Sequence, residues 1–215
     1  MNKFIAQATG LSRRAADELI KAGRVAIDEN PASLGQEVGS NNTVSLDGRQ
    51  LIRPGEYLTI MINKPAGYVC SRSGQGSQTI YDLLPKKYHN LKPVGRLDKD
   101  SSGLLLMTDN GQLANELTHP RYQKEKVYQA SLNKTLSPPD KKKLMSGVEL
   151  SDGMSKFTNI KDCSDKVYEV VLKEGRNRQI RRTFNALGYK VEILQRTQFG
   201  PYKLNNLKPR DIAII

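Results

Sequence analysis

The sequence predicts an α+β protein in which a small α/β module precedes a mixed, largely antiparallel sheet with helices packed on it. Segments with the alternating apolar pattern of strands outnumber segments with helical periodicity. Several connections between the strand-like segments are too short for a parallel crossover, which favours antiparallel pairing. Apolar residues make up 37% of the 215 residues, so the chain can also bury a core. Together these features indicate the α+β class.

The first part of the chain has the pattern of two helices followed by short strands. One helix is predicted over residues 3–8, and a second begins after the N-cap Ser12 and stops at Gly23, which favours a left-handed backbone. Alternation typical of strands then occupies residues 24–28 and 43–46. We therefore expect a small α/β domain here.

A break in the pattern at Arg53-Pro54-Gly55 divides the chain. We take it as the linker between a small domain, residues 1–55, and a larger domain, residues 56–215. In the larger domain the patterns predict strands at 57–63, 103–108, 127–132, 167–172 and 189–194, and helices at 112–117, 136–145 and 177–187.

The charge of the chain is strongly basic and unevenly distributed. The formal net charge is +12 at pH 7, yet residues 1–55 hold seven Lys and Arg against six Asp and Glu. The larger domain carries nearly all of the surplus, which indicates a polyanionic partner because Lys and Arg displace the counterions of phosphates. A basic surface that only faces solvent is the alternative.

Other classes of protein fit the sequence poorly. No stretch approaches the about 20 apolar residues that a membrane span needs, and no apolar signal segment opens the chain. The cysteines Cys70 and Cys163 and the two histidines are too few and too scattered for a zinc cluster. We expect a cytoplasmic monomer with reduced thiols, no metal and no membrane contact.

A polar segment, Gly95-Arg96-Leu97-Asp98-Lys99-Asp100-Ser101-Ser102-Gly103, leads directly into a very apolar predicted strand. Loops at the mouth of a buried strand commonly present catalytic groups. Arg96 and Lys99 favour the ionised form of Asp98, which can act as a nucleophile or a general base. The residues alone favour a plainer role, in which Asp98 or Asp100 only closes an Asx turn.

A second polar segment, residues 174–182, combines a helical core-facing pattern with several arginines. These are Arg176, Arg178, Arg181 and Arg182. Their guanidinium groups repel one another unless anions lie between them. Phosphates, or a carboxylate such as that of Asp98, fit the bidentate geometry of arginine. A solvated basic helix is the alternative.

A third segment, Lys124-Glu125-Lys126-Val127-Tyr128, carries an aromatic residue on a predicted strand. Tyr128 suits either a strand core or a platform on which a nucleic-acid base stacks. The residues alone do not separate these roles.

Taken together, the three segments resemble the motifs of bacterial ribosomal RNA pseudouridine synthases of the Rsu/Rlu type. The matching stretches are residues 94–105, 126–128 and 175–182, in the order of that family. Residues 63–67, Asn63-Lys64-Pro65-Ala66-Gly67, resemble a further family segment. Residues 2–48 resemble the small RNA-binding domain named after ribosomal protein S four. The resemblance covers nearly the whole chain and outweighs the Asx-turn interpretation of Asp98.

The resemblance implies a reaction and a set of catalytic groups. The uracil–ribose bond breaks, the base turns, and carbon 5 joins the ribose, without a cofactor or metal. Asp98 would be the nucleophile, Tyr128 would stack on the base and assist proton transfer, and Arg181 would pair with Asp98. The uridine must be flipped out of its stack to reach such a site.

The same resemblance implies contacts with RNA from both domains. The residues expected to bind RNA are Arg13, Arg14, Lys21, Arg24, Lys64, Arg96, Arg176, Arg178 and Arg182.

The resemblance is closer to the large-subunit branch of the family because of residues 174–182 and 147–153. We therefore expect site-specific isomerisation of uridine to pseudouridine in large-subunit ribosomal RNA, free or in an assembling subunit. The alternatives are a synthase for small-subunit ribosomal RNA and a non-catalytic RNA-binding factor of ribosome assembly.

Overall fold

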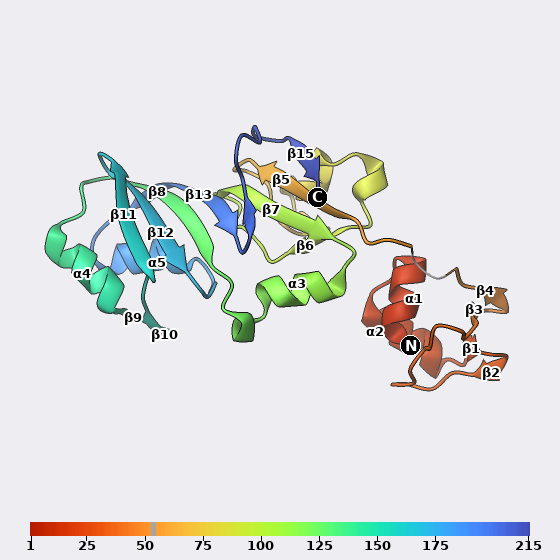
Figure 1. Ribbon diagram of the computed structural model, residues 1–215. Coiled ribbons are helices and arrows are strands. Elements are labelled where there is room, and N and C mark those ends of the chain that lie inside the picture. The colour runs from red at the N-terminus through yellow and green to blue at the C-terminus, as the bar shows by residue number, and fades with distance from the viewer. Residues whose placement is uncertain (53–54) are drawn as a thin grey trace. The chain divides into compact units, whose positions relative to one another are not determined.

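The computed structural model describes residues 1–52 and 55–215, and the chain divides into two compact units, residues 1–57 and 58–215. The units are coloured from red to blue along the chain in Figure 1. Arg53 and Pro54 of the predicted linker lie outside the described residues.

Unit 1 contains two helices and a small sheet. Its elements are α1 (Asn2–Thr9), α2 (Arg13–Lys21), β1 (Val25–Ile27), β2 (Asn30–Pro31), β3 (Val44–Leu46) and β4 (Arg49–Gln50). The sheet has the order β2-β1-β3-β4. The side chain of Ser12 accepts a hydrogen bond from the backbone of Ala15 and caps α2, as the sequence predicts. Ile5, Ile20 and Val25 pack in the core between helices and sheet.

Unit 2 is built around one sheet of nine strands (Figure 1). Its strands are β5 (Thr59–Lys64), β6 (Lys92–Val94), β7 (Ser102–Thr108), β8 (Lys126–Leu132), β11 (Asn159–Ser164), β12 (Val167–Leu172), β13 (Val191–Phe199), β14 (Tyr202–Lys203) and β15 (Ile212–Ile214). Strands β9 (Val148–Leu150) and β10 (Gly153–Ser155) form a separate hairpin. The helices are α3 (Gly111–Thr118), α4 (Pro138–Ser146) and α5 (Gln179–Ala186), with 3-10 turns η1 (Ile80–Leu83), η2 (Lys86–Tyr88) and η3 (Pro120–Tyr122).

The sheet is mixed and largely antiparallel, which confirms that part of the predicted fold class. Its order is β11-β12-β8-β13-β7-β5-β15, and among the described residues only β13 and β7 pair in parallel. At this junction Gly103 lies opposite Arg196. A Cβ atom on Gly103 would lie 2.3 Å from the carbonyl oxygen of Arg196, so only glycine permits the approach.

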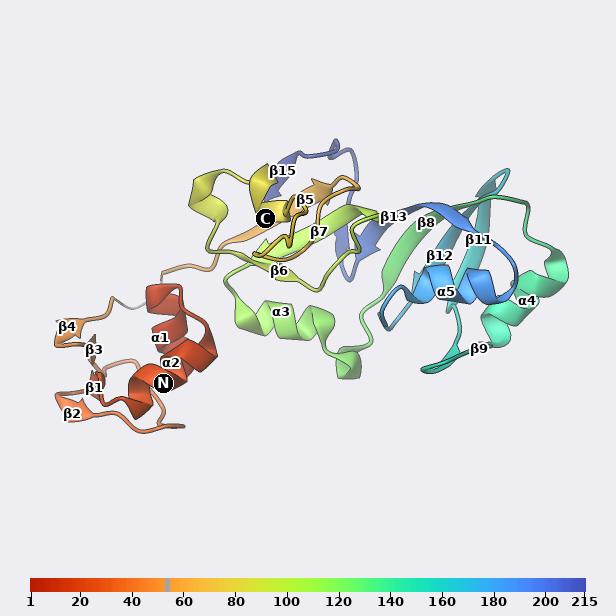
Figure 2. The same ribbon diagram turned by 180° about the vertical axis from the view of Figure 1, so that it is seen from behind.

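Helices cover the two halves of the sheet differently. Leu144 of α4 and Phe184 of α5 pack against β8 and β12 in one core, and α5 crosses these strands in Figure 2. Strand β7 is buried on both faces, because Leu105 packs towards the 3-10 turns and Leu104 towards α3. A strand buried on both faces explains the continuous apolar run at residues 104–107.

The structure adds several strands that the sequence patterns did not indicate. The hairpin β9–β10, the edge strands β11 and β15, and the short strands β6 and β14 are two to six residues long and mostly exposed or polar. Strand β13 extends to Phe199, five residues beyond its predicted end. No helix among the described residues is long and apolar enough to cross a membrane.

Candidate active site

A cavity of about 520 Å³ opens in unit 2 where the two halves of the sheet meet. Asp98 and Tyr128 both line it, together with Arg96, Arg178 and Arg196. The three segments that the sequence singles out therefore converge on one hollow. We call it the Asp98 cavity.

Asp98 lies in the loop of residues 95–101, which we call the Asp98 loop. Its side chain is half-buried and accepts no hydrogen bond from any residue that the structure describes. The backbone of Asp98 instead makes the turn, because its carbonyl accepts a hydrogen bond from the amide of Ser101 at 3.1 Å. The carboxylate is thus available for chemistry rather than used in an Asx turn.

Lys64 holds the Asp98 loop from beneath. Its ammonium donates to the carbonyl oxygens of Pro65 at 3.0 Å, Asp98 at 3.1 Å and Ser101 at 2.6 Å. The residue has 0% exposure, and burial lowers the pKa of its side chain. The prediction that Lys64 binds RNA is therefore wrong, because its three donors are already used inside the protein.

Arg181 holds the same loop from the other side. Its Nη2 donates to the carbonyl of Asp100 at 2.9 Å, its Nη1 donates to the carbonyl of Val191 at 2.7 Å, and its Nε lies 3.3 Å from the Asp100 carboxylate. This differs from the pairing with Asp98 that the resemblance implies. Only Lys99 separates the two aspartates, and it is Asp100 that faces α5 while Asp98 faces the cavity.

Asp100 is the common anion of two arginines. Arg178 binds its two carboxylate oxygens at 2.9 Å each, beside the contact from Arg181. The hydrogen bond from Arg178 lowers the pKa of Asp100 and keeps it ionised. Arg178 stands at the rim of the Asp98 cavity with about half of its side chain exposed.

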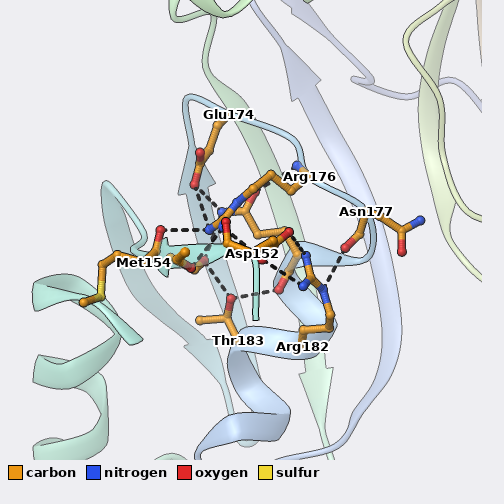
Figure 3. Close-up of polar contacts among 10 residues, drawn as sticks. Asp152, Met154, Glu174, Arg176, Asn177, Arg182 and Thr183 are labelled. Atoms are coloured by element: carbon orange, nitrogen blue, oxygen red, sulfur yellow. Dashed lines mark hydrogen bonds and ion pairs between the residues drawn. The ribbon is translucent and has the colours of Figure 1, made fainter. Parts of the chain in front are cut away.

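The other two arginines of this segment share a second carboxylate. Arg182 binds both oxygens of Asp152 at 2.9 and 2.7 Å, and Arg176 reaches the same carboxylate at 3.0 Å (Figure 3). Arg176 also donates to the carbonyl oxygens of Asp152, Gly153 and Met154. The cluster therefore fastens the β9–β10 hairpin to α5. Asp152 thus pairs with both arginines, and their contact with RNA phosphates stays a prediction.

Tyr128 lies in β8, directly opposite Arg196 of β13. Its ring packs partly against both cores of the sheet, and the residue lines the cavity. Sequence reasoning missed Arg196, since the predicted strand ended at Leu194. A lone arginine two residues beyond that inward-facing leucine was the available signal.

The remaining basic residues differ in whether their side chains already have a partner within the protein. Arg96 is exposed at the cavity rim, and Arg14 is exposed on α2; among the described residues neither has an acidic partner. Arg13 donates to the side chain of Asn2. Lys21 pairs with Glu18 and Arg24 with Asp47, so both already have an acidic partner within unit 1.

The cavity is electrostatically suited to an anion. Lys126 and Arg196 line its inner part, and burial, together with the charge of Arg196, lowers the pKa of Lys126. Cys70 also lines it, and burial raises the pKa of its thiol, so the thiol stays protonated. Within the described ranges no three metal-ligating side chains gather.

The sequence and the fold are similar to those of known RNA-modifying enzymes. Residues 58–186 match the family described as RNA pseudouridylate synthase. An uncharacterized RNA pseudouridine synthase of Aquifex aeolicus is 37% identical over 97% of this chain and 87% of its own length. Ribosomal large subunit pseudouridine synthase B of Bacillus subtilis is 34% identical over 98% of this chain and 89% of its own length.

A solved structure agrees with these relatives. A crystal structure described as pseudouridylate synthase superimposes with a TM-score of 0.71 at 29% identity, covering all of this chain and 94% of that chain. The family match spans more than half of the chain and includes Asp98, Tyr128 and Arg181. The chain belongs to the RNA pseudouridylate synthase family, the enzymes that isomerise uridine to pseudouridine in RNA.

Proposed function

We propose that the protein isomerises one specific uridine of large-subunit ribosomal RNA, with Asp98 as the nucleophile. One observation carries the assignment of the site. Within the described ranges the Asp98 carboxylate has no hydrogen-bond or ion-pair partner, and it lies with Tyr128 in a cavity of nucleotide size, on a loop that Lys64 and Arg181 hold in place. A preorganised carboxylate next to an aromatic ring suits attack on a flipped nucleoside.

The cavity residues have distinct roles in this proposal. Asp98 attacks the nucleoside, and Tyr128 stacks on the uracil and helps to move the proton from carbon 5. Arg181 is a positioning residue that acts on Asp98 through the carbonyl of Asp100. Arg96 and Arg178 stand at the rim, where the phosphates of a flipped nucleotide remain.

The large-subunit assignment rests on the relatives. The Bacillus relative is named for that subunit, and it is similar over nearly its whole length. The test uses purified protein with unmodified transcripts of large- and small-subunit ribosomal RNA, followed by chemical mapping of pseudouridine in each. Conversion of a single large-subunit uridine supports the proposal. Conversion only in the small-subunit transcript contradicts the branch, and tight binding without conversion in either contradicts the catalytic assignment.

We also propose that unit 1 is an RNA-binding domain like that of ribosomal protein S four. Its helix α2 begins with the exposed pair Arg13-Arg14, and neither guanidinium is held by a carboxylate among the described residues. Free arginines at a helix start suit phosphate contacts, since the backbone amides there also favour anions.

Replacing both arginines in Arg13→Gln/Arg14→Gln should weaken RNA binding without slowing the bound enzyme. We expect the Kd for the ribosomal RNA substrate to rise about tenfold and the salt dependence of log Kd to decrease by about two counterions. The kcat at saturating RNA should stay the same, because the chemistry lies in unit 2. Arg49→Gln, an exposed change in β4, is the matched control. An unchanged Kd contradicts the role of unit 1.

A further inference from the structure

Arg196 is a buried cation that forms no ion pair with any residue the structure describes. Its side chain is 2% exposed, and Nε donates to the carbonyl of Leu104 at 2.8 Å. Its guanidinium lies 4.7 Å from the ring centre of Phe199. Neither Nη1 nor Nη2 donates a hydrogen bond to any residue in the described part of the chain, and Nη2 is fully enclosed. A buried guanidinium normally has an acidic partner because desolvation is costly.

Arg196 differs from Lys64 and Arg181, two other buried or half-buried cations of unit 2, in how its hydrogen-bond donors are used. Lys64 uses its three donors on carbonyl oxygens, and Arg181 uses its own on Asp100 and Val191. Structural roles therefore account for those two side chains. For Arg196 the Nε contact accounts for only part of the guanidinium, and the residue also lines the Asp98 cavity.

The position of Arg196 determines which part of a bound nucleotide its guanidinium can contact. It lies directly opposite Tyr128 on the neighbouring antiparallel strand, where opposite side chains are in contact distance. A base stacked on Tyr128 therefore brings its edge to the guanidinium. Phosphates stay at the rim with Arg96 and Arg178, because they are charged and remain hydrated while the base enters the buried part.

The edge of a uracil offers the acceptor that this arginine lacks. When the bond between C1′ and N1 breaks, its electron pair stays with N1, and the negative charge spreads over N1, O2 and O4. The carboxylate of Asp98 takes the bond at C1′. After the base turns, C5 attacks C1′ and displaces the carboxylate, C5 loses its proton, and N1 gains one, so the product is an isomer.

We propose that Arg196 is a catalytic residue whose guanidinium binds a carbonyl oxygen of the flipped uracil and stabilises the negative charge that develops on the base. This inference rests on the proposed function of the Asp98 cavity. A fixed cation in a site that excludes water is far more effective at this task than the same cation in solvent. Phe199 and the Leu104 carbonyl hold the guanidinium in place before the substrate arrives.

The test compares Arg196→Gln with the wild type on the ribosomal RNA substrate. Glutamine keeps an N–H donor for the Leu104 carbonyl and removes the charge. We expect kcat to fall about 100-fold while KM changes less than about threefold. Lys203→Gln, which removes an exposed charge from β14, is the control for net charge. Arg196→Lys keeps the charge and should recover part of kcat.

A second readout separates this role from a structural one. RNA carrying 5-fluorouridine at the target has a better leaving base, because fluorine stabilises the uracil anion. The ratio of wild-type to Arg196→Gln single-turnover rates for its consumption should be smaller than the ratio for uridine. A merely misfolded variant gives the same ratio with both substrates, and that result overturns the proposal. A rise in KM with unchanged kcat also overturns it, because it indicates a phosphate contact. A wild type that converts no uridine contradicts the proposed function itself.

Discussion

Asp98→Asn is expected to abolish pseudouridine formation and to leave RNA binding and stability unchanged. Asparagine has nearly the same shape but neither the charge nor the nucleophilic oxygen, so kcat should fall at least about 10⁴-fold. The side chain of Asp98 holds no hydrogen bond within the described structure, so the free energy of unfolding should change by less than about 0.5 kcal/mol. Isomerisation rates, RNA affinity and thermal unfolding of one preparation measure all three effects.

A matched substitution shows whether this loss is specific. Asp165 is an exposed residue next to β12, and among the residues described its carboxylate accepts a hydrogen bond only from the hydroxyl of Thr135. Asp165→Asn removes the same charge and should keep wild-type turnover. If Asp98→Asn retains more than about a tenth of wild-type kcat, Asp98 is not the nucleophile.

Lys64→Met is expected to lower both stability and turnover, although the lysine does not line the Asp98 cavity. Methionine fills a similar volume but leaves the carbonyl oxygens of Pro65, Asp98 and Ser101 without the donor they share. Three weakened acceptors cost about 3 kcal/mol, and removal of a buried charge offsets part of this, so we expect a net loss of about 2 kcal/mol. Denaturant unfolding measures it.

The effect of Lys64→Met on catalysis follows from the geometry of the Asp98 loop. The ammonium fixes the backbone of Asp98 itself, and a shift of about 1 Å in a reacting group can cost about 100-fold in rate. We therefore expect kcat to fall about 100-fold. The affinity for RNA should stay unchanged, since no phosphate contact is lost. Lys92→Met on β6 is an exposed control. A variant that is destabilised yet fully active would show that the loop keeps its shape without the lysine.

The residue patterns predicted the central helices and strands of unit 2, because burial of one face gives such an element regularly spaced apolar residues. β12 spans the predicted residues 167–172, and α5 lies within the predicted helix. The edge strands β11 and β15 escaped prediction, since a strand with one exposed edge and few buried side chains carries little alternation. The position of β15 also depends on β5, a partner distant in sequence.

The sequence singled out the segments that line the Asp98 cavity, but it did not predict which side chains pair with one another. The crowded arginines did require anions, but spacing cannot tell a phosphate from Asp100 or Asp152, which lie many residues earlier in the chain. Lys64 was assigned to RNA from the family resemblance, and its burial depends on three carbonyls that only the fold brings together. Arg196 lay beyond the predicted strand end, and its isolation is a property of the fold alone.

The parallel junction between β7 and β13 has a consequence for the timing of folding. Ser102 of β7 pairs with Gln195 of β13, far along the chain, and the Asp98 cavity includes residues from Val69 to Phe199. During synthesis the N-terminal part of a chain emerges first, and contacts between distant segments form last. Unit 1 can fold while the ribosome is still translating the rest. The Asp98 cavity closes only when β13 arrives, long after the Asp98 loop has been made, and β15 then joins the edge of the sheet beside β5.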